Sequence, residues 1–128
     1  MEKDRNKKIE KTKANILEAL LLLLQHKEIN EISIRELTET AHIHRNTFYI
    51  HYTDIYDILA EVEENMCRKV KEMTDGMEPT QLKENLEVVL ESVFEYLYQE
   101  REKCGLIMRY RGSVSSGKGL VESIFVKY

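Results

Sequence analysis

The sequence predicts an all-α protein, because helical patterns fill most of its 128 residues and patterns typical of sheets are almost absent. The composition is 42% hydrophobic and 33% charged, with one proline and five glycines, which suits a helix-rich globular chain. This length allows one compact domain, or a small module continuous with a second helical layer, but not two independent domains. We therefore expect a three-helix head over residues 1–53, followed over residues 54–128 by a long connecting helix and partial C-terminal helices.

The first predicted helix runs from about Asn6 to His26. The longest apolar run, Ala19–Leu24, has six residues, against the roughly 20 that span a bilayer. We therefore expect this helix to contribute to a folded core, and we expect no membrane segment. The helix is indicated by aliphatic side chains that recur on one face of a 3.6-residue period: Ile9, Ile16, Leu17, Leu20, Leu21 and Leu24.

A short second helix has a well-defined start. Ser33 and Glu36 form an S-x-x-E capping box, and Ile32 and Leu37 are placed as its hydrophobic staple. We expect this helix to end near Ala41.

A tight turn over residues 41–43 leads into a third helix, from His44 to about Tyr52. Ile43, Phe48 and Tyr52 provide its inward face. Tyr49 follows Phe48 directly, so it points elsewhere.

The fourth helix is the long connecting one and stops near Asp75-Gly76. Thr53 is its expected cap, with Asp54 and Asp57 in the first turn, where negative charge suits the helix dipole. Its apolar positions are Ile55, Ile58, Leu59, Val62, Met66, Val70 and Met73.

After a break between Gly76 and Pro79, the pattern predicts a fifth helix and a short sixth one over Leu106–Tyr110. The stretch Gly112–Gly119 resembles a mobile connector, and Leu120–Tyr128 begins another apolar helical pattern. The fifth helix carries Leu82, Leu86, Val89, Leu90, Val93 and Leu97.

Charge is distributed unevenly along the chain. The net charge of −4 argues against a nucleic-acid-binding domain recognisable by bulk basicity. Residues 1–13 nevertheless carry six basic and three acidic side chains, whereas residues 58–101 carry eleven acidic and five basic ones. The acidic balance therefore lies away from the head.

Cysteine usage and the N-terminus indicate a reducing compartment. Cys67 and Cys104 lie far apart and outside any C-x-x-C pattern, so we expect reduced, buried thiols rather than a disulfide or a zinc site. The charged start lacks the apolar core and cleavage site of a secretory signal, which predicts a cytoplasmic protein. No pattern indicates a cofactor.

The segment His42–Thr53 carries the chemistry of a DNA-reading element. It contains no acid, and it offers many hydrogen-bond donors. Two short helices joined by a turn of about three residues form the geometry in which the second helix enters the major groove. The donors are His44, Arg45, Asn46, Thr47, Tyr49 and His51.

The run SIRELTETAHIHRNTFYIHYTDIYDIL resembles the signature of the TetR/AcrR family of transcription regulators. The resemblance covers roughly residues 9–75 and is strongest at Ser33–Leu37, at Thr47–Tyr49, and at Tyr52 and Leu59. It implies a homodimer on a near-palindromic operator, in most cases a repressor. It also implies a C-terminal helical domain that binds a small-molecule effector.

The resemblance also assigns roles to single positions. Arg45, Asn46 and Thr47 would contact bases or the groove, and Tyr49 and His51 would contact phosphates, with His44 as a further DNA-facing donor. Ser33, Arg35 and Thr53 would hold the DNA backbone, and a helix N-terminus at Thr53 is a favourable phosphate site on its own.

Three positions depart from the family pattern. His42 replaces the usual turn glycine, which strains the turn if a positive φ is needed. His44 replaces a small capping residue and weakens the cap, and Ile55 replaces a lysine that would contact phosphate. Either the affinity for DNA is low, or the basic side chains between Lys3 and Lys13 compensate as a flexible arm.

Members of that family generally continue through further C-terminal helices, which form the dimer and close the effector pocket. Either this chain is truncated, or it dimerises through a reduced surface. The residues Phe94, Tyr98, Met108 and Tyr110 are candidates for an effector pocket, although aromatic and methionine residues on helices are more often core.

Other classes of function have less support in the sequence. His42, His44 and His51 lack fitting carboxylate or cysteine ligands nearby, so no metal site is expected. No convergent acid, base and nucleophile indicates an enzyme. A protein-interaction adaptor built on a regulator-like head is the main alternative.

Overall fold

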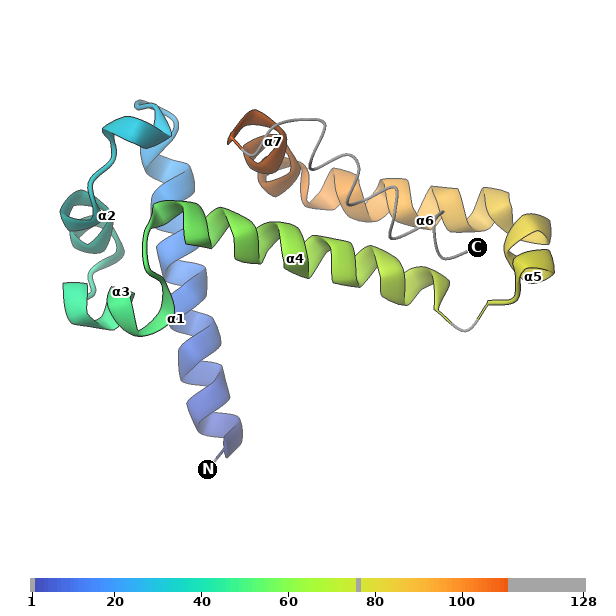
Figure 1. Cartoon of the computed structure of the whole chain (residues 1–128), viewed down its shortest axis with the longest axis horizontal. Helices are drawn as coiled ribbons and strands as arrows, with labels where there is room; N and C mark the ends of the chain where they lie inside the picture. Colours follow the sequence, from blue (N-terminus) through green and yellow to red (C-terminus); the bar gives the residue numbers. More distant parts are fainter. Residues whose placement is uncertain (1, 76, 111–128) are drawn as a thin grey trace. The chain divides into compact units, whose positions relative to one another are not determined.

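The computed structural model describes residues 2–75 and 77–110, which fold into α-helices and one short 3₁₀ helix without any strand (Figure 1). This confirms the all-α prediction. The predictions for Gly112–Gly119 and Leu120–Tyr128 lie outside the described residues. The chain divides into two compact units, one that ends at Ile58 and one that begins at Leu59, and each is described by itself.

The first unit contains α1 (Glu2–Leu23), η1 (Ile29–Glu31), α2 (Ile34–Ala41), α3 (Arg45–His51) and the first turn of α4 (Ile55–Thr74). α1 packs against α2, and α2 contacts α3. Burial of aliphatic and aromatic side chains between these helices stabilises α2 and α3, which are too short to be stable alone. The fully buried large side chains of the first unit are Ile16, Leu20, Leu37, Phe48 and Ile58.

α1 begins four residues earlier than predicted and ends three residues earlier. Glu2 and Asp4 lie in its first turn, where acids suit the helix dipole, so the basic segment forms helix rather than a flexible arm. At the other end, the amides of Gln25 and His26 bond to carbonyls three residues back, which tightens the chain into a turn.

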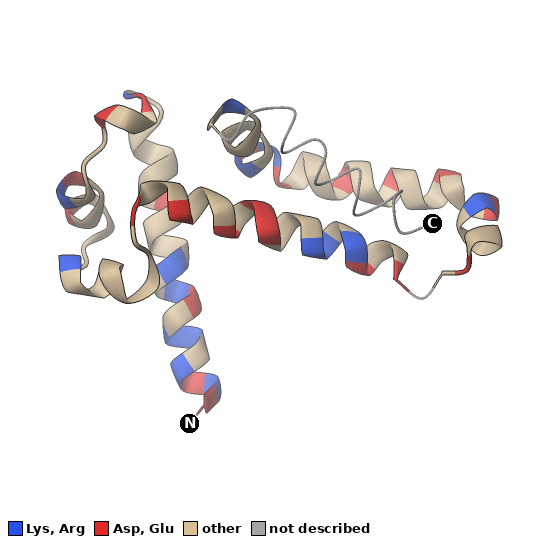
Figure 2. Ribbon diagram, viewed as in Figure 1, with Lys and Arg blue, Asp and Glu red and all other residues tan. Residues whose placement is uncertain are grey.

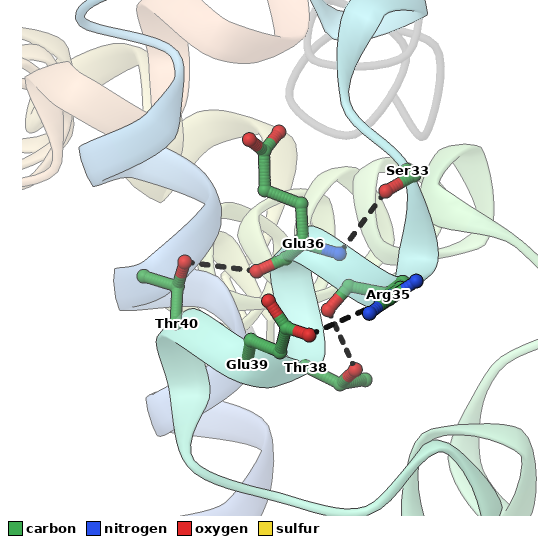
Figure 3. Close-up of polar contacts among 6 residues, drawn as sticks. All are labelled: Ser33, Arg35, Glu36, Thr38, Glu39 and Thr40. Carbon is green, nitrogen blue, oxygen red and sulfur yellow. Dashed lines mark hydrogen bonds and ion pairs between the residues drawn. The ribbon is translucent and has the colours of Figure 1, made fainter.

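The start of α2 is capped as predicted, but only in one direction. The Oγ of Ser33 accepts a hydrogen bond from the amide of Glu36 at 3.0 Å (Figure 3). The Glu36 carboxylate does not return the bond. Its Oε2 pairs with the Nζ of Lys27 at 2.6 Å, and its Oε1 has no hydrogen-bond partner among the described residues. The acid therefore ties the loop after α1 to α2.

The second unit contains the remainder of α4, α5 (Pro79–Glu84), α6 (Leu86–Gln99) and α7 (Arg101–Tyr110). α4 ends at Thr74, close to the predicted end. A core of four buried side chains joins α4, α5 and α6, namely Val70, Leu82, Val89 and Val93.

The fifth predicted helix is in fact two helices. α5 begins at Pro79 with a reciprocal capping box between Glu78 and Gln81. The chain then leaves helical geometry at Asn85, whose side-chain amide donates to the Gln81 carbonyl at 2.9 Å. The continuous apolar stripe hid this break, because Asn85 falls on its polar side.

α7 starts at Arg101 rather than at Leu106. Its first turn is polar, so an apolar pattern misses it, but the amide of Cys104 already bonds to the carbonyl of Glu100 at 3.0 Å. In the described part of the chain, no helix is both long enough and apolar enough to cross a membrane.

Candidate nucleic-acid interface

The turn between α2 and α3 depends on His42. This residue has φ 58° and ψ 44°, in the left-handed region, and it is the C-cap of α2. The amide of His42 bonds to the Glu39 carbonyl at 3.2 Å and the amide of Ile43 to the Thr38 carbonyl at 3.0 Å, the pattern of a Schellman motif. The positive φ expected to strain this turn is therefore present in a residue other than glycine.

The inward side of α3 fixes the helix to the head. Phe48 is 0% exposed and Tyr52 is buried, with their ring centroids 5.6 Å apart, whereas Ile43 is only half-buried. The Nζ of Lys13 in α1 lies 5.8 Å from the Tyr52 ring centroid, within cation–π range. α1 thus supports the end of α3.

The outward side of α3, which we call the α3 face, consists of Arg45, Asn46, Tyr49 and Ile50, all of them exposed. Residues four apart are neighbours on a helix, so Arg45 lies beside Tyr49 and Asn46 beside Ile50. The Arg45 guanidinium is 6.0 Å from the Tyr49 ring centroid. The face therefore offers a cation, an amide, a phenol and an aliphatic side chain to a partner.

Ile50 is the member of this face that sequence reasoning missed. It is 76% exposed, more than any other large hydrophobic side chain in the described residues. The signal was present in the helical period. Phe48 and Tyr52 both point inward, and a residue two positions from each of them must point away.

Three other predicted DNA contacts lie outside the α3 face: two are less exposed, and one is at the start of α3. Thr47 and His51 are half-buried, on the flank between the α3 face and the buried side. His44 is exposed and is the N-cap of α3, and its side chain makes no capping hydrogen bond. The expectation that His44 weakens the cap is confirmed.

Charge on α3 favours an anionic partner, whereas α2 carries two acids, Glu36 and Glu39, against one base, Arg35. α3 carries no acid, as Figure 2 shows, and it begins with a basic side chain. On α2, the Nε of Arg35 pairs with Oε1 of Glu39 at 3.2 Å (Figure 3). Both side chains are mostly exposed, and such surface pairs contribute little, so Arg35 is available to a phosphate.

The start of α4 corrects the predicted cap. The amide of Asp57 donates to Oδ1 of Asp54, which makes Asp54 the N-cap in place of Thr53. The amide and hydroxyl of Thr53 donate to Oδ2 of Asp57 at 2.9 and 3.0 Å, and these bonds lower the pKa of that carboxyl. Two carboxylates thus occupy the helix start where a phosphate was expected.

The second unit contains a separate apolar cavity of about 520 Å³, formed by α4, α6 and α7. Of the four predicted effector-pocket residues, Phe94, Tyr98 and Met108 line it, and Tyr110 lies outside the lining. The complete lining is Glu63, Met66, Cys67, Phe94, Leu97, Tyr98, Arg101, Cys104, Ile107 and Met108.

Neither cysteine forms a disulfide, and both line this cavity. They are half-buried rather than buried as predicted, because they border an open space instead of the core. Burial and the nearby Glu100 carboxylate raise the pKa of the Cys104 thiol. Over residues 2–75 and 77–110, no group of three His, Cys, Asp or Glu side chains is placed to hold a metal ion.

Comparison with known proteins supports a helix-turn-helix relationship. Over 57 residues, which is 44% of this chain, the sequence is 37% identical to the "uncharacterized HTH-type transcriptional regulator YxbF" of Bacillus subtilis (strain 168). The matched part is 15% of that relative, so the likeness covers a small fraction of its length. No family model matches the chain. No solved structure matches it either.

Proposed function

We propose that this chain is a DNA-binding transcriptional regulator in which α2 crosses the DNA backbone and α3 enters the major groove. The observation that carries the proposal is the α3 face, which is exposed, free of acids and presented by a helix-turn-helix. Its dimensions fit the groove, because one helix fills the major groove of B-form DNA. The likeness to a helix-turn-helix regulator supports the same reading.

The residues of this interface divide into two kinds. We assign Arg45 and Asn46, near the N-terminus of α3, to base edges, where recognition helices in this docking mode make their contacts. We assign Tyr49, His51, Ser33 and Arg35 to phosphates, with Thr47 and His44 as further contacts. Thr53 contributes only if its bonds to Asp57 open.

α1 adds positive charge to the same unit. Its N-terminal half is predominantly basic (Figure 2), and its first seven residues, 2–8, are all exposed. We propose that this basic helix contacts phosphates that flank the site. This would take over the role expected of a flexible arm.

The test is duplex binding by variants of the α3 face. Arg45→Ala and Tyr49→Ala should each weaken binding about tenfold or more, as measured by fluorescence anisotropy, without a change in melting temperature. Arg68→Ala is the matched control, because Arg68 is exposed on α4 and bonds only to Asn65 among the contacts described. Unchanged binding by both α3 variants would remove the recognition helix from the proposal.

We further propose a TetR-like repressor that works as a homodimer and is controlled by a small molecule in the cavity of the second unit. An apolar space of about 520 Å³ suits a drug-sized ligand. Val88 on α6 is exposed and lies outside the cavity lining, which supports an association surface on that side of α6. Light scattering tests the dimer, and a monomer would contradict it. Release of bound duplex on addition of a ligand tests the control by a small molecule, and a complex that does not respond to the ligand would contradict that part.

A protein-interaction adaptor is the second candidate, favoured by the exposed Ile50 and by the apolar side chains on α6. An adaptor has no affinity for duplex DNA even at low salt. Binding that strengthens steeply as salt falls excludes it.

A further inference from the structure

The α3 face places an amide beside an aliphatic side chain. Asn46 and Ile50 are both exposed and lie four residues apart, so they are neighbours on one row of the helix. Arg45 and Tyr49 form the adjacent row and approach each other to 6.0 Å. The basic and aromatic chemistry is thus separated from a row that carries no charge.

Ile50 is the most exposed large hydrophobic side chain of the described residues, and its neighbours on the α3 face are polar. It gains nothing from the protein's own core, and burying it against a partner is favoured in proportion to the area removed from water. Phosphates cannot provide such a contact. In the major groove, the apolar group on offer is the C5-methyl of thymine.

The neighbouring Asn46 is suited to adenine, the base that pairs with thymine. Asparagine can donate to N7 of adenine and accept from its N6 amino group. Every A·T pair shows these adenine atoms and the thymine methyl together on its major-groove edge. The two residues therefore match one kind of base pair, or two adjacent pairs of that kind.

We infer that the Asn46–Ile50 row makes this chain selective for A·T pairs, with Ile50 contacting a thymine methyl and Asn46 contacting an adenine. The inference rests on the proposed function and adds its sequence preference. The Arg45–Tyr49 row supplies affinity and can add contact with a guanine. One row thus provides the preference for A·T pairs, and the other provides most of the affinity.

The test uses duplexes selected by the full chain from a random pool and then modified atom by atom. Replacing thymine by uracil at the selected site removes only the methyl group. At the contacted position the unaltered protein should bind about fourfold more weakly, the loss expected for one buried methyl. Ile50→Ser should bind the thymine duplex equally weakly and show no further loss with uracil.

Asn46 is tested in the same way. Replacing adenine by 7-deazaadenine removes the N7 acceptor, which should weaken the unaltered protein about tenfold and leave Asn46→Ala insensitive. Leu22→Ser is the matched control for Ile50→Ser, because Leu22 is an exposed aliphatic residue on α1 outside the α3 face. It should retain the full response to uracil. Thermal melting checks that each variant is folded.

The outcomes separate this inference from the proposed function. Selected duplexes whose binding does not respond to uracil or to 7-deazaadenine would overturn the A·T preference and leave DNA binding standing. Equal affinities of Ile50→Ser and the unaltered protein would do the same, because they would show that Ile50 makes no contact with the duplex. Failure of the pool to yield any bound duplex would overturn both.

Discussion

At the scale of single residues, the backbone conformation of His42 determines the turn between α2 and α3. A residue with a Cβ atom at φ 58° costs roughly 1–2 kcal/mol relative to the right-handed region, and glycine avoids that cost. The turn is nevertheless closed by both Schellman hydrogen bonds. The chain thus tolerates strain at the point that sets the angle of α3.

His42→Gly should therefore raise the free energy of unfolding by about 1 kcal/mol. Urea unfolding monitored by circular dichroism measures it. His42→Val should move stability in the opposite direction, because a β-branched residue fits positive φ poorly. A glycine variant less stable than the parent would show that the imidazole makes a compensating contact.

Asp57 gives a pH-dependent signature at the start of α4. Its pKa is lowered in the folded chain by the amide and hydroxyl of Thr53. A lowered pKa means that the carboxylate stabilises the fold at pH values above about 4, and that this stabilisation is lost as the pH falls through the folded value.

Asp57→Asn should accordingly be less stable than the parent at pH 7, with the difference narrowing as the pH falls below about 4. Urea midpoints at pH 7 and pH 3 provide the comparison. Glu64→Gln, an exposed change in the middle of α4, is the control and should show little difference at either pH. A constant gap for Asp57→Asn across this range would exclude the hydrogen-bonded carboxylate as its cause.

At the scale of elements, one side of α3 packs against the rest of the head and the other side is exposed to solvent. Phe48 is 0% exposed and Ile50 is 76% exposed, although only one residue separates them. Because a helix turns by 100° per residue, this contrast follows from the helical period alone. We therefore expect stability and recognition to depend on different residues of the same seven-residue helix.

Phe48→Ala should destabilise the head by about 3–5 kcal/mol, the usual cost of emptying a buried phenylalanine site. Ile50→Ala should change stability by less than about 0.5 kcal/mol, as exposed substitutions do. Chemical unfolding of both variants gives the comparison. Similar losses for the two would mean that α3 is oriented differently from the structure described.

The elements also show what sequence patterns can predict. The start of α2, the α2–α3 turn and the end of α4 were placed closely, because caps and apolar stripes are local signals. The break at Asn85 and the start of α7 were missed, since both depend on hydrogen bonds that leave the apolar stripe unchanged. The N-cap of α4 was placed one residue early, because Thr53 and Asp54 are both good capping residues.

The candidate site was predictable in part for the same reason. The absence of acids in α3 is visible in the sequence, but the exposure of Ile50 depends on which side packs against the head. The role of Glu36 depends on Lys27, nine residues earlier, and no local pattern connects the two.

At the scale of the whole molecule, the two units carry different chemistry. The first presents the acid-free α3 and the basic N-terminal half of α1, and the second contains an apolar cavity lined by both cysteines of the chain. We expect DNA binding to depend on the first and ligand binding on the second.

A ligand in the cavity should protect Cys67 and Cys104 together. Alkylation by iodoacetamide in the presence of an apolar dye should slow at both thiols, as measured by mass spectrometry on the Cys67→Ser and Cys104→Ser variants. Because its pKa is raised, Cys104 should also react more slowly than a free thiol at pH 7 and accelerate at higher pH. Protection of one thiol alone would contradict a single shared cavity.

The central claim is that the helix-turn-helix unit binds duplex DNA through the acid-free α3 and the basic N-terminal half of α1, even though the chain as a whole carries a net charge of −4. The most direct measurement is the dependence of duplex affinity on salt for the unaltered protein and for Arg45→Ala. The claim predicts that the affinity of the unaltered protein falls steeply as the salt concentration rises. Arg45→Ala should bind more weakly, and if Arg45 contacts a phosphate, the slope of log affinity against log salt concentration should be smaller in magnitude by about one. No measurable duplex affinity at low salt, or affinity that is independent of salt, would contradict it.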